Sequence, residues 1–216
     1  MPYGYLGTAP NQIKKNSGVF SVSDINELKA EGSLGGSTQL IATQSAGNSA
    51  QTLDFSNCFT AEYEIYKIHW KNYVPTNDEN TLRLRLKNSS GEITGGSAYS
   101  FAIQYLNSGG GEGENRSTGT DYLQIMGGGG SGTGENAEGD IYIYQPFDSS
   151  YYTYYTMNTT FVDQNATYNQ FFGGGMYETA DSVTGCVFRN ISSGGTLGNI
   201  NTCDISIYGM KELWVI

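Results

Sequence analysis

The stretch "TLRLRLK" (residues 81–87) decides the fold. Leucine occupies its even positions, and the basic residues Arg83, Arg85 and Lys87 occupy the odd positions. Successive side chains of a β-strand point to opposite faces of a sheet, whereas a helix repeats every 3.6 residues. The alternation therefore predicts a strand that buries Leu82, Leu84 and Leu86 and turns its basic side chains to water.

Similar patterns on both sides of this stretch predict an all-β chain. The composition agrees, because 30 Gly and 17 Tyr accompany only 15% charged residues. We expect strands at 38–44, 50–55, 62–70, 97–106, 121–126, 140–147, 151–163, 166–178 and 182–193, followed by a C-terminal strand. Gly47-Asn48 is the predicted turn between the first two, and Pro75 ends the third. Their number and spacing predict an antiparallel β-sandwich of jelly-roll type over residues 37–216.

A Gly-rich segment interrupts this pattern at residues 108–140. Because glycine weakens regular elements, we expect a solvated loop with one short strand at 121–126. The segment lacks the Lys-Ser/Thr of a phosphate-binding loop. Glu135, Glu138 and Asp140 offer oxygen ligands, but their spacing matches neither an EF-hand nor a calcium-binding repeat. We therefore predict no metal site here.

Residues suited to catalysis are few. Cys58, Cys186 and Cys203 fit no metal-binding spacing and are expected to be buried thiols. His69, the single histidine, is expected to be a half-buried strand residue with a hydrogen-bonded ring, in preference to a general base. Paired carboxylates that cleave sugars remain the enzymatic alternative. The expectation is a protein without enzymatic activity or cofactor.

The net charge of −10 falls on residues 37–216, because the charges of residues 1–36 cancel. An acidic body repels phosphate backbones, so we do not expect nucleic-acid binding. We recognise neither a signal peptide nor an apolar run long enough to cross a membrane. The chain is expected to fold in a cytosol.

A cluster of tyrosines lies in the strand predicted at 151–163. Tyr152 and Tyr154 share one face of that strand, and Tyr151 and Tyr155 share the other. Three interpretations remain open, namely the core of the sandwich, an oligomer interface, or a surface that stacks on sugar rings.

Residues 1–36 have a different character from the body. Gly and Pro residues break the aromatic start of this segment, which cannot bury its own side chains. A short helix is predicted in "SDINELKAEG" (23–32), with Ile25 and Leu28 on one face, and residues 32–37 form a flexible joint. Such a segment is typical of an arm that docks onto a partner protein.

The string "GYLGTAPNQIKKNSGVFSVSDINEL" resembles the N-termini of virion structural proteins of tailed bacteriophages, particularly marine and cyanobacterial ones. The matching positions are Gly4, Tyr5, Gly7, Pro10, Lys14, Ser17, Gly18, Val19, Phe20, Asp24 and Leu28. Four blocks of the body are similar, in order, to blocks of phage β-sandwich modules, namely "LIATQSAGNSAQTLDFS", "EYEIYKIHWKNYVP", "IYIYQPFDSSYYTYY" and "CDISIYGMKEL". Residues 108–140 match no such block.

The resemblance implies a tail-fibre or adsorption-apparatus subunit that assembles into a virion in the host cytoplasm. Capsid decoration is the first alternative, and a carbohydrate-binding module is the second. The implied partners are other virion proteins and further copies of the chain, with a trimer favoured, and a host-surface glycan is an additional candidate. The predicted docking residues of the arm are Tyr3, Gly4, Tyr5, Leu6, Gly7, Pro10, Lys14, Val19, Phe20, Ile25 and Leu28.

Overall fold

The computed structural model describes residues 38–210 of the chain. The predicted arm at residues 1–36, its helix and its docking residues lie outside this range. The described part is all-β, and it contains no helix that would reach across a membrane. Its strands are β1 (Thr38–Ala50), β2 (Thr52–Phe55), β3 (Ile65–Pro75), β4 (Thr81–Asn88), β5 (Gly91–Glu92), β6 (Tyr99–Asn107), β7 (Glu112–Thr120), β8 (Leu123–Gln124), β9 (Ala137–Tyr144), β10 (Thr153–Val162), β11 (Tyr168–Tyr177), β12 (Gly185–Ile191) and β13 (Ile200–Met210).

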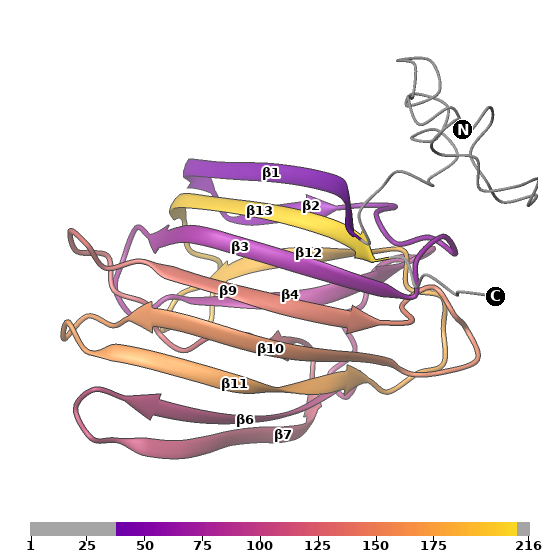
Figure 1. Cartoon of the computed structure of the whole chain (residues 1–216). Coiled ribbons are helices and arrows are strands. Elements are labelled where there is room, and N and C mark those ends of the chain that lie inside the picture. The colour runs from indigo at the N-terminus through magenta and orange to yellow at the C-terminus, as the bar shows by residue number, and fades with distance from the viewer. Residues whose placement is uncertain (1–37, 211–216) are drawn as a thin grey trace, which may run out of the picture. The chain divides into compact units, whose positions relative to one another are not determined.

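The strands form two antiparallel sheets that lie face to face (Figure 1). One sheet has eight strands in the order β1-β13-β3-β9-β10-β11-β6-β7. The other has five strands, with β2-β12-β4-β5 as its path and β8 paired to β4. The chain passes from one sheet to the other between β1 and β2, between β2 and β3, and between β3 and β4.

One hydrophobic core fills the space between the sheets. The prediction for "TLRLRLK" is confirmed on its apolar side, because Leu82, Leu84 and Leu86 are buried. On the eight-stranded sheet, Tyr66, Ile68 and Trp70 of β3 are also fully buried and belong to the same cluster. Burying each of the leucine and isoleucine side chains contributes about 1.5–3 kcal/mol of transfer free energy.

Buried tyrosines also link the two sheets by hydrogen bonds. The Tyr73 hydroxyl of β3 donates to Asn190 Oδ1 of β12 at 3.0 Å. The Tyr155 hydroxyl of β10 donates to the carbonyl oxygen of Gln124 in β8 at 2.8 Å. Burial raises the pKa of both phenols well above the usual value, so each remains a donor. These bonds satisfy polar groups that the core would otherwise leave unpaired.

The predicted turn at Gly47-Asn48 is wrong. Strand β1 continues through these residues to Ala50, and the chain bends at Gln51. The two segments expected to form a hairpin belong to different sheets, because β1 pairs with β13 and β2 with β12. Turn-forming residues do not end a strand when pairing with a neighbouring strand favours an extended backbone.

The Gly-rich segment 108–140 differs from the predicted solvated loop. Residues Glu112–Thr120 form β7, which pairs with β6 in an antiparallel register. The expected strand at 121–126 is reduced to β8. Residues 127–130 pack closely, since a Cβ atom on Gly128 would lie 3.0 Å from Glu79 Cα. These glycines therefore permit a close approach of the backbone, which composition alone does not reveal.

Candidate functional site

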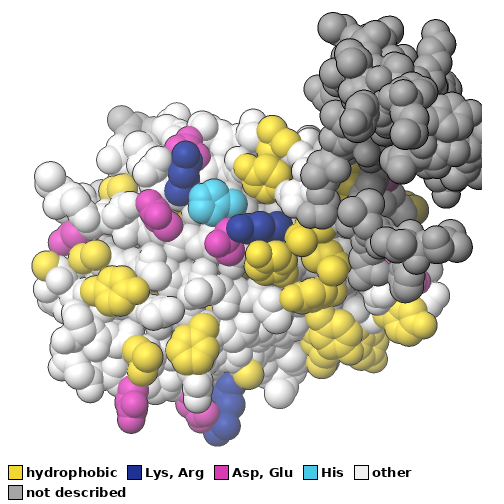
Figure 2. Space-filling view, in the orientation of Figure 1, with side chains coloured by type: hydrophobic (Ala, Val, Ile, Leu, Met, Phe, Trp, Pro, Cys, Tyr) yellow, Lys and Arg dark blue, Asp and Glu magenta, His cyan; other side chains and the backbone are white. Residues whose placement is uncertain are grey.

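The outer face of the eight-stranded sheet carries exposed hydrophobic side chains beside clusters of charged ones (Figure 2). Tyr154 and Phe172 are exposed there on neighbouring strands. Aromatic side chains that are left exposed on a sheet face are typical of surfaces that bind other molecules.

A groove of about 740 Å³ crosses this face over β10, β11, β6 and β7. The register places Thr156, Gly174 and Ala102 side by side on adjacent strands. Arg116 of β7 is the next residue in this row, opposite Ala102. Because the central residues of the row have small side chains, the surface is hollow between Tyr154 and Arg116, both of which line the groove.

The hollow depends on the glycines at the middle of β11. A Cβ atom on Gly174 would lie 2.3 Å from the Tyr155 carbonyl oxygen, and one on Gly175 would lie 2.2 Å from the Ser100 carbonyl oxygen. Both contacts are to the backbone of a neighbouring strand, which cannot move aside without breaking the sheet. The sequence "GGG" at 173–175 thus fits a strand that is closely packed on both sides.

The structure separates the predicted tyrosine cluster into two groups. Tyr151, Tyr152 and Tyr154 are 58%, 42% and 49% exposed, whereas Tyr155 is 2% exposed. Tyr151 and Tyr152 precede β10, so strand alternation applies only to Tyr154 and Tyr155. Of the three interpretations, the core fits Tyr155, whereas the other three tyrosines are exposed.

His69 lies on the same outer face and contacts Asp140. Its Nδ1 atom is 3.0 Å from Asp140 Oδ1, and Lys67 Nζ lies 3.0 Å from the same oxygen. The predicted half-buried histidine with a hydrogen-bonded ring is therefore confirmed. The hydrogen bond to Asp140 raises the pKa of Lys67.

Ser206 stands opposite His69 in the register, which gives the order serine, histidine, aspartate across three strands. Ser206 and His69, both within the described residues, are not joined by a hydrogen bond, and β13 is paired on both sides. The backbone amides of β13 near Ser206 are thus engaged in the sheet. We interpret the row as an ion-paired surface cluster.

The calcium ligands considered from sequence do not come together. In the described residues, no group of three or more His, Cys, Asp or Glu side chains is placed to hold a metal ion. The Glu135 carboxylate instead accepts a hydrogen bond from the Gly132 amide at 2.7 Å, while Asp140 pairs with His69.

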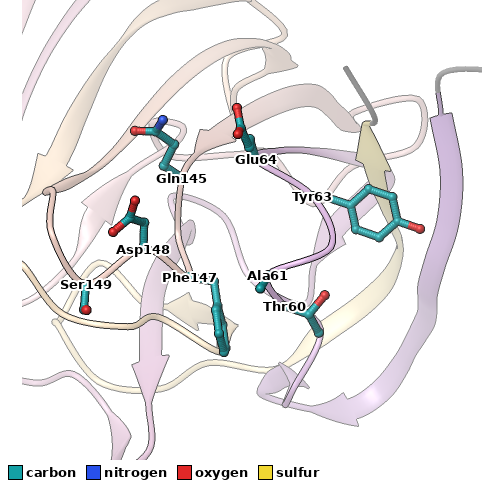
Figure 3. Close-up of a pocket in the computed structure, with 8 residues that line it drawn as sticks. All are labelled: Thr60, Ala61, Tyr63, Glu64, Gln145, Phe147, Asp148 and Ser149. Carbon is teal, nitrogen blue, oxygen red and sulfur yellow. The ribbon is translucent and has the colours of Figure 1, made fainter. Parts of the chain in front are cut away.

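A second pocket lies between the segments 60–64 and 145–149 (Figure 3). It has a volume of about 330 Å³. Gln145, Asp148 and Glu64 present polar groups on one side, and Phe147 and Thr60 lie on the other. The Asp148 carboxylate accepts a hydrogen bond from the Ser150 amide at 2.8 Å and so stabilises its own turn.

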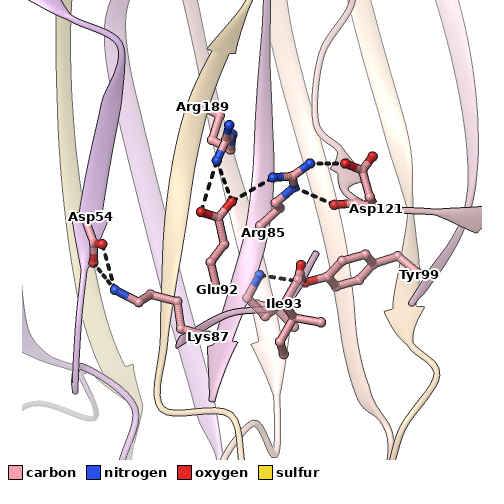
Figure 4. A network of polar contacts seen from close by, with 9 residues as sticks. Asp54, Arg85, Lys87, Glu92, Ile93, Tyr99, Asp121 and Arg189 are labelled. Atoms are coloured by element: carbon pink, nitrogen blue, oxygen red, sulfur yellow. Dashed lines mark hydrogen bonds and ion pairs between the residues drawn. The ribbon is translucent and has the colours of Figure 1, made fainter. Parts of the chain in front are cut away.

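A network of ion pairs covers part of the outer face of the five-stranded sheet (Figure 4). Glu92 accepts hydrogen bonds from Arg85 at 2.9 Å and from Arg189 at 2.7 Å, and Arg85 also pairs with Asp121. Lys87 Nζ lies 2.6 Å from Asp54.

The prediction that Arg83, Arg85 and Lys87 face water is therefore wrong. The side chains of Arg85 and Lys87 are only 14% and 16% exposed. The Arg83 guanidinium lies 3.9 Å from the centre of the Tyr122 ring, in a cation–π contact. Alternation correctly predicted that these three side chains point away from the core. Acidic side chains cover Arg85 and Lys87, and the Tyr122 ring covers Arg83.

The predicted buried thiols are confirmed. Cys58, Cys186 and Cys203 are free and buried. Burial raises the pKa of Cys203 to about 12, so its reactive thiolate form is suppressed.

Comparison with known proteins found no counterpart: no family model, no curated protein and no solved structure matches this chain.

Proposed function

We propose that this chain is a non-enzymatic structural protein of a tailed-bacteriophage virion, in the form of a tail-fibre or adsorption-apparatus subunit. The observation that carries the proposal is the pairing of an open aromatic face on one sheet with a closed, ion-paired face on the other. In such a module the aromatic face is available to bind another molecule, and the ion-paired face stabilises the fold. The resemblance of the N-terminal segment and the body blocks to phage virion proteins supports the same interpretation.

The strand order supports a jelly-roll topology for the two sheets. The first strand neighbours the last (β1 and β13), and the second neighbours the penultimate (β2 and β12). Next in each sheet come β3 beside β13 and β4 beside β12. This nested order is what results when a long antiparallel ribbon wraps into two sheets. In this scheme β6, β7, β10 and β11 are additions that widen one sheet and carry the groove. Jelly rolls occur in both viral capsid and lectin domains, so the topology alone does not decide the function.

In this proposal residues 1–36 attach the module to the particle, and the wide sheet faces the host. Copies of the chain associate around a symmetry axis of the particle, with a trimer favoured. The capsid-decoration alternative uses the same arm on a capsid subunit.

The test is quantitative mass spectrometry of purified particles made from the genome that encodes this chain, measured against the major capsid protein. About a dozen copies per particle is the expected result, because the symmetry of the tail limits the number of fibres. Hundreds of copies would replace the tail-fibre form of the proposal with capsid decoration. Absence from the particle would overturn it altogether.

A further inference from the structure

We propose that the groove across β10, β11, β6 and β7 binds a saccharide that carries a carboxylate group. The inference rests on the proposed function, since an adsorption subunit must present a binding surface to its host. It adds the position of that surface and the chemical class of its ligand.

The shape of the groove suits a sugar ring. Gly174 and Ala102 form a floor without long side chains, so a flat ring can approach the sheet backbone. Tyr154, which is 49% exposed, lines the groove and offers an aromatic surface to the C–H groups of a pyranose. Tyrosine provides this area at a low entropic cost and keeps a hydroxyl for hydrogen bonding.

Polar groups are placed around the floor in the way that sugar hydroxyls require. Ser117 and Thr118 line the groove next to Arg116. Thr156 contributes a hydroxyl that lies 3.0 Å from the Tyr144 hydroxyl, and this contact orients it. A few positioned polar groups around an apolar surface are typical of small-molecule sites.

The charge of the groove selects an acidic ligand. Among the described residues that line the groove, Arg116 is the one charged side chain, although the chain has a net charge of −10. The Glu178 carboxylate at the edge of the groove is engaged, because it accepts a hydrogen bond from the lining Ser100 hydroxyl. The ion pair of Arg116 with Glu114 is 3.1 Å long, but the two side chains are 74% and 61% exposed, so the pair is weak. A ligand carboxylate can therefore take the place of Glu114 and form two parallel hydrogen bonds with the guanidinium.

The test is isothermal titration calorimetry with the full chain and tetramers of galacturonic, mannuronic and sialic acid. Each tetramer is compared with its methyl ester, which keeps the sugar skeleton and removes the charge. We expect at least one acid tetramer to bind about tenfold more tightly than its ester. Arg116→Gln should remove this difference. Ala102→Trp should abolish binding by filling the groove, whereas Gln104→Trp, an exposed position on the same strand and face, should bind as the wild type does.

Failure of every acid tetramer to bind would overturn the inference, as would binding that Ala102→Trp leaves unchanged. Equal affinity for acid and ester would overturn the acidic class of the ligand. If Ala102→Trp abolishes self-association in light scattering, and the wild type binds no saccharide, the groove would be assigned to a second copy of the chain. None of these outcomes affects the particle count, so failure of the inference and failure of the proposed function can be told apart.

Discussion

The two sheets pack on one core, but their outer faces differ in the side chains that they present to solvent. On the five-stranded sheet, Glu92 and Asp54 neutralise basic side chains that are mostly buried. On the eight-stranded sheet, Tyr154 and Phe172 remain exposed beside a hollow floored by Gly174. A face that buries its charges in mutual pairs gains rigidity, whereas a face with exposed aromatic rings keeps free area for a ligand. The difference indicates which side of the module is available for recognition.

The largest effect is expected from Gly174→Ala. The new Cβ would lie 2.3 Å from the Tyr155 carbonyl oxygen, so β10 and β11 would have to separate. We expect a loss of about 3 kcal/mol or more in the free energy of unfolding, measured by urea denaturation. Gly119→Ala is the control, because its Cβ would have its nearest neighbour, Ser97 Oγ, at 3.6 Å. Equal stability of the two variants would contradict the role given to the glycines.

Glu92→Ala should be the next most destabilising change. It leaves Arg85 and Arg189 without their shared carboxylate, at positions where the side chains are only 14% and 21% exposed. The expected loss is about 2–3 kcal/mol in the free energy of unfolding. Glu114→Ala removes a similar pair on the open face and should cost less than about 0.5 kcal/mol. Similar losses of unfolding free energy in the two variants would contradict the conclusion that ion pairs stabilise the five-stranded sheet more than the eight-stranded one.

The adjacent tyrosines of β10 give a matched pair of hydroxyl deletions. Tyr155→Phe leaves the Gln124 carbonyl oxygen without its donor in the core, which should cost about 1–2 kcal/mol. Tyr154→Phe removes an exposed hydroxyl and should leave the midpoint of thermal unfolding unchanged within about 1 °C. The comparison is made by differential scanning calorimetry. An unchanged midpoint for Tyr155→Phe would show that its hydrogen bond does not tie the sheets.

The smallest effect concerns acid stability. Hydrogen bonds from Ser45 and Asn72 lower the pKa of Asp204 below its ordinary value of 3.8. Because the folded-state pKa is the lower one, this stabilisation is present above about pH 4 and is lost as the pH falls through the folded value. Asp204→Asn should cost less than about 1 kcal/mol at pH 7. The difference from wild type should shrink below about pH 4, as followed by urea denaturation at a series of pH values. A difference that grows on acidification would contradict the assignment.

Period-two alternation predicted the part of the fold that depends on local pattern. Leu82, Leu84 and Leu86 are buried as expected, and Pro75 does end β3. The pattern failed where long-range pairing decides the outcome. Strand β7 has a composition unfavourable to strands, yet it pairs with β6 along most of its length. Gly47 lies inside β1 for the same reason.

Only part of the candidate site could be predicted from the sequence. The sequence left the tyrosines near residue 151 open to assignment as core, oligomer interface or sugar-binding surface. Alternation placed Tyr151 and Tyr155 on one face, whereas Tyr155 is buried and Tyr151 is exposed. Arg116 lies in a segment that we expected to be a loop, and it joins Ala102 only through the register of β6 and β7. The run of glycines at 173–175 was the one available signal for the hollow, because glycines inside a strand indicate a close approach of the backbone.

Host adsorption of particles with one blocked sheet face shows whether the eight-stranded sheet is the recognition surface. Ala102→Trp fills the groove on the eight-stranded sheet, and Thr52→Trp places the same side chain at an exposed position of β2 on the five-stranded sheet. With incorporation of both variants verified by mass spectrometry, we expect the adsorption rate to fall at least about tenfold for Ala102→Trp and to stay unchanged for Thr52→Trp. Normal adsorption of Ala102→Trp particles would contradict this assignment of the recognition surface.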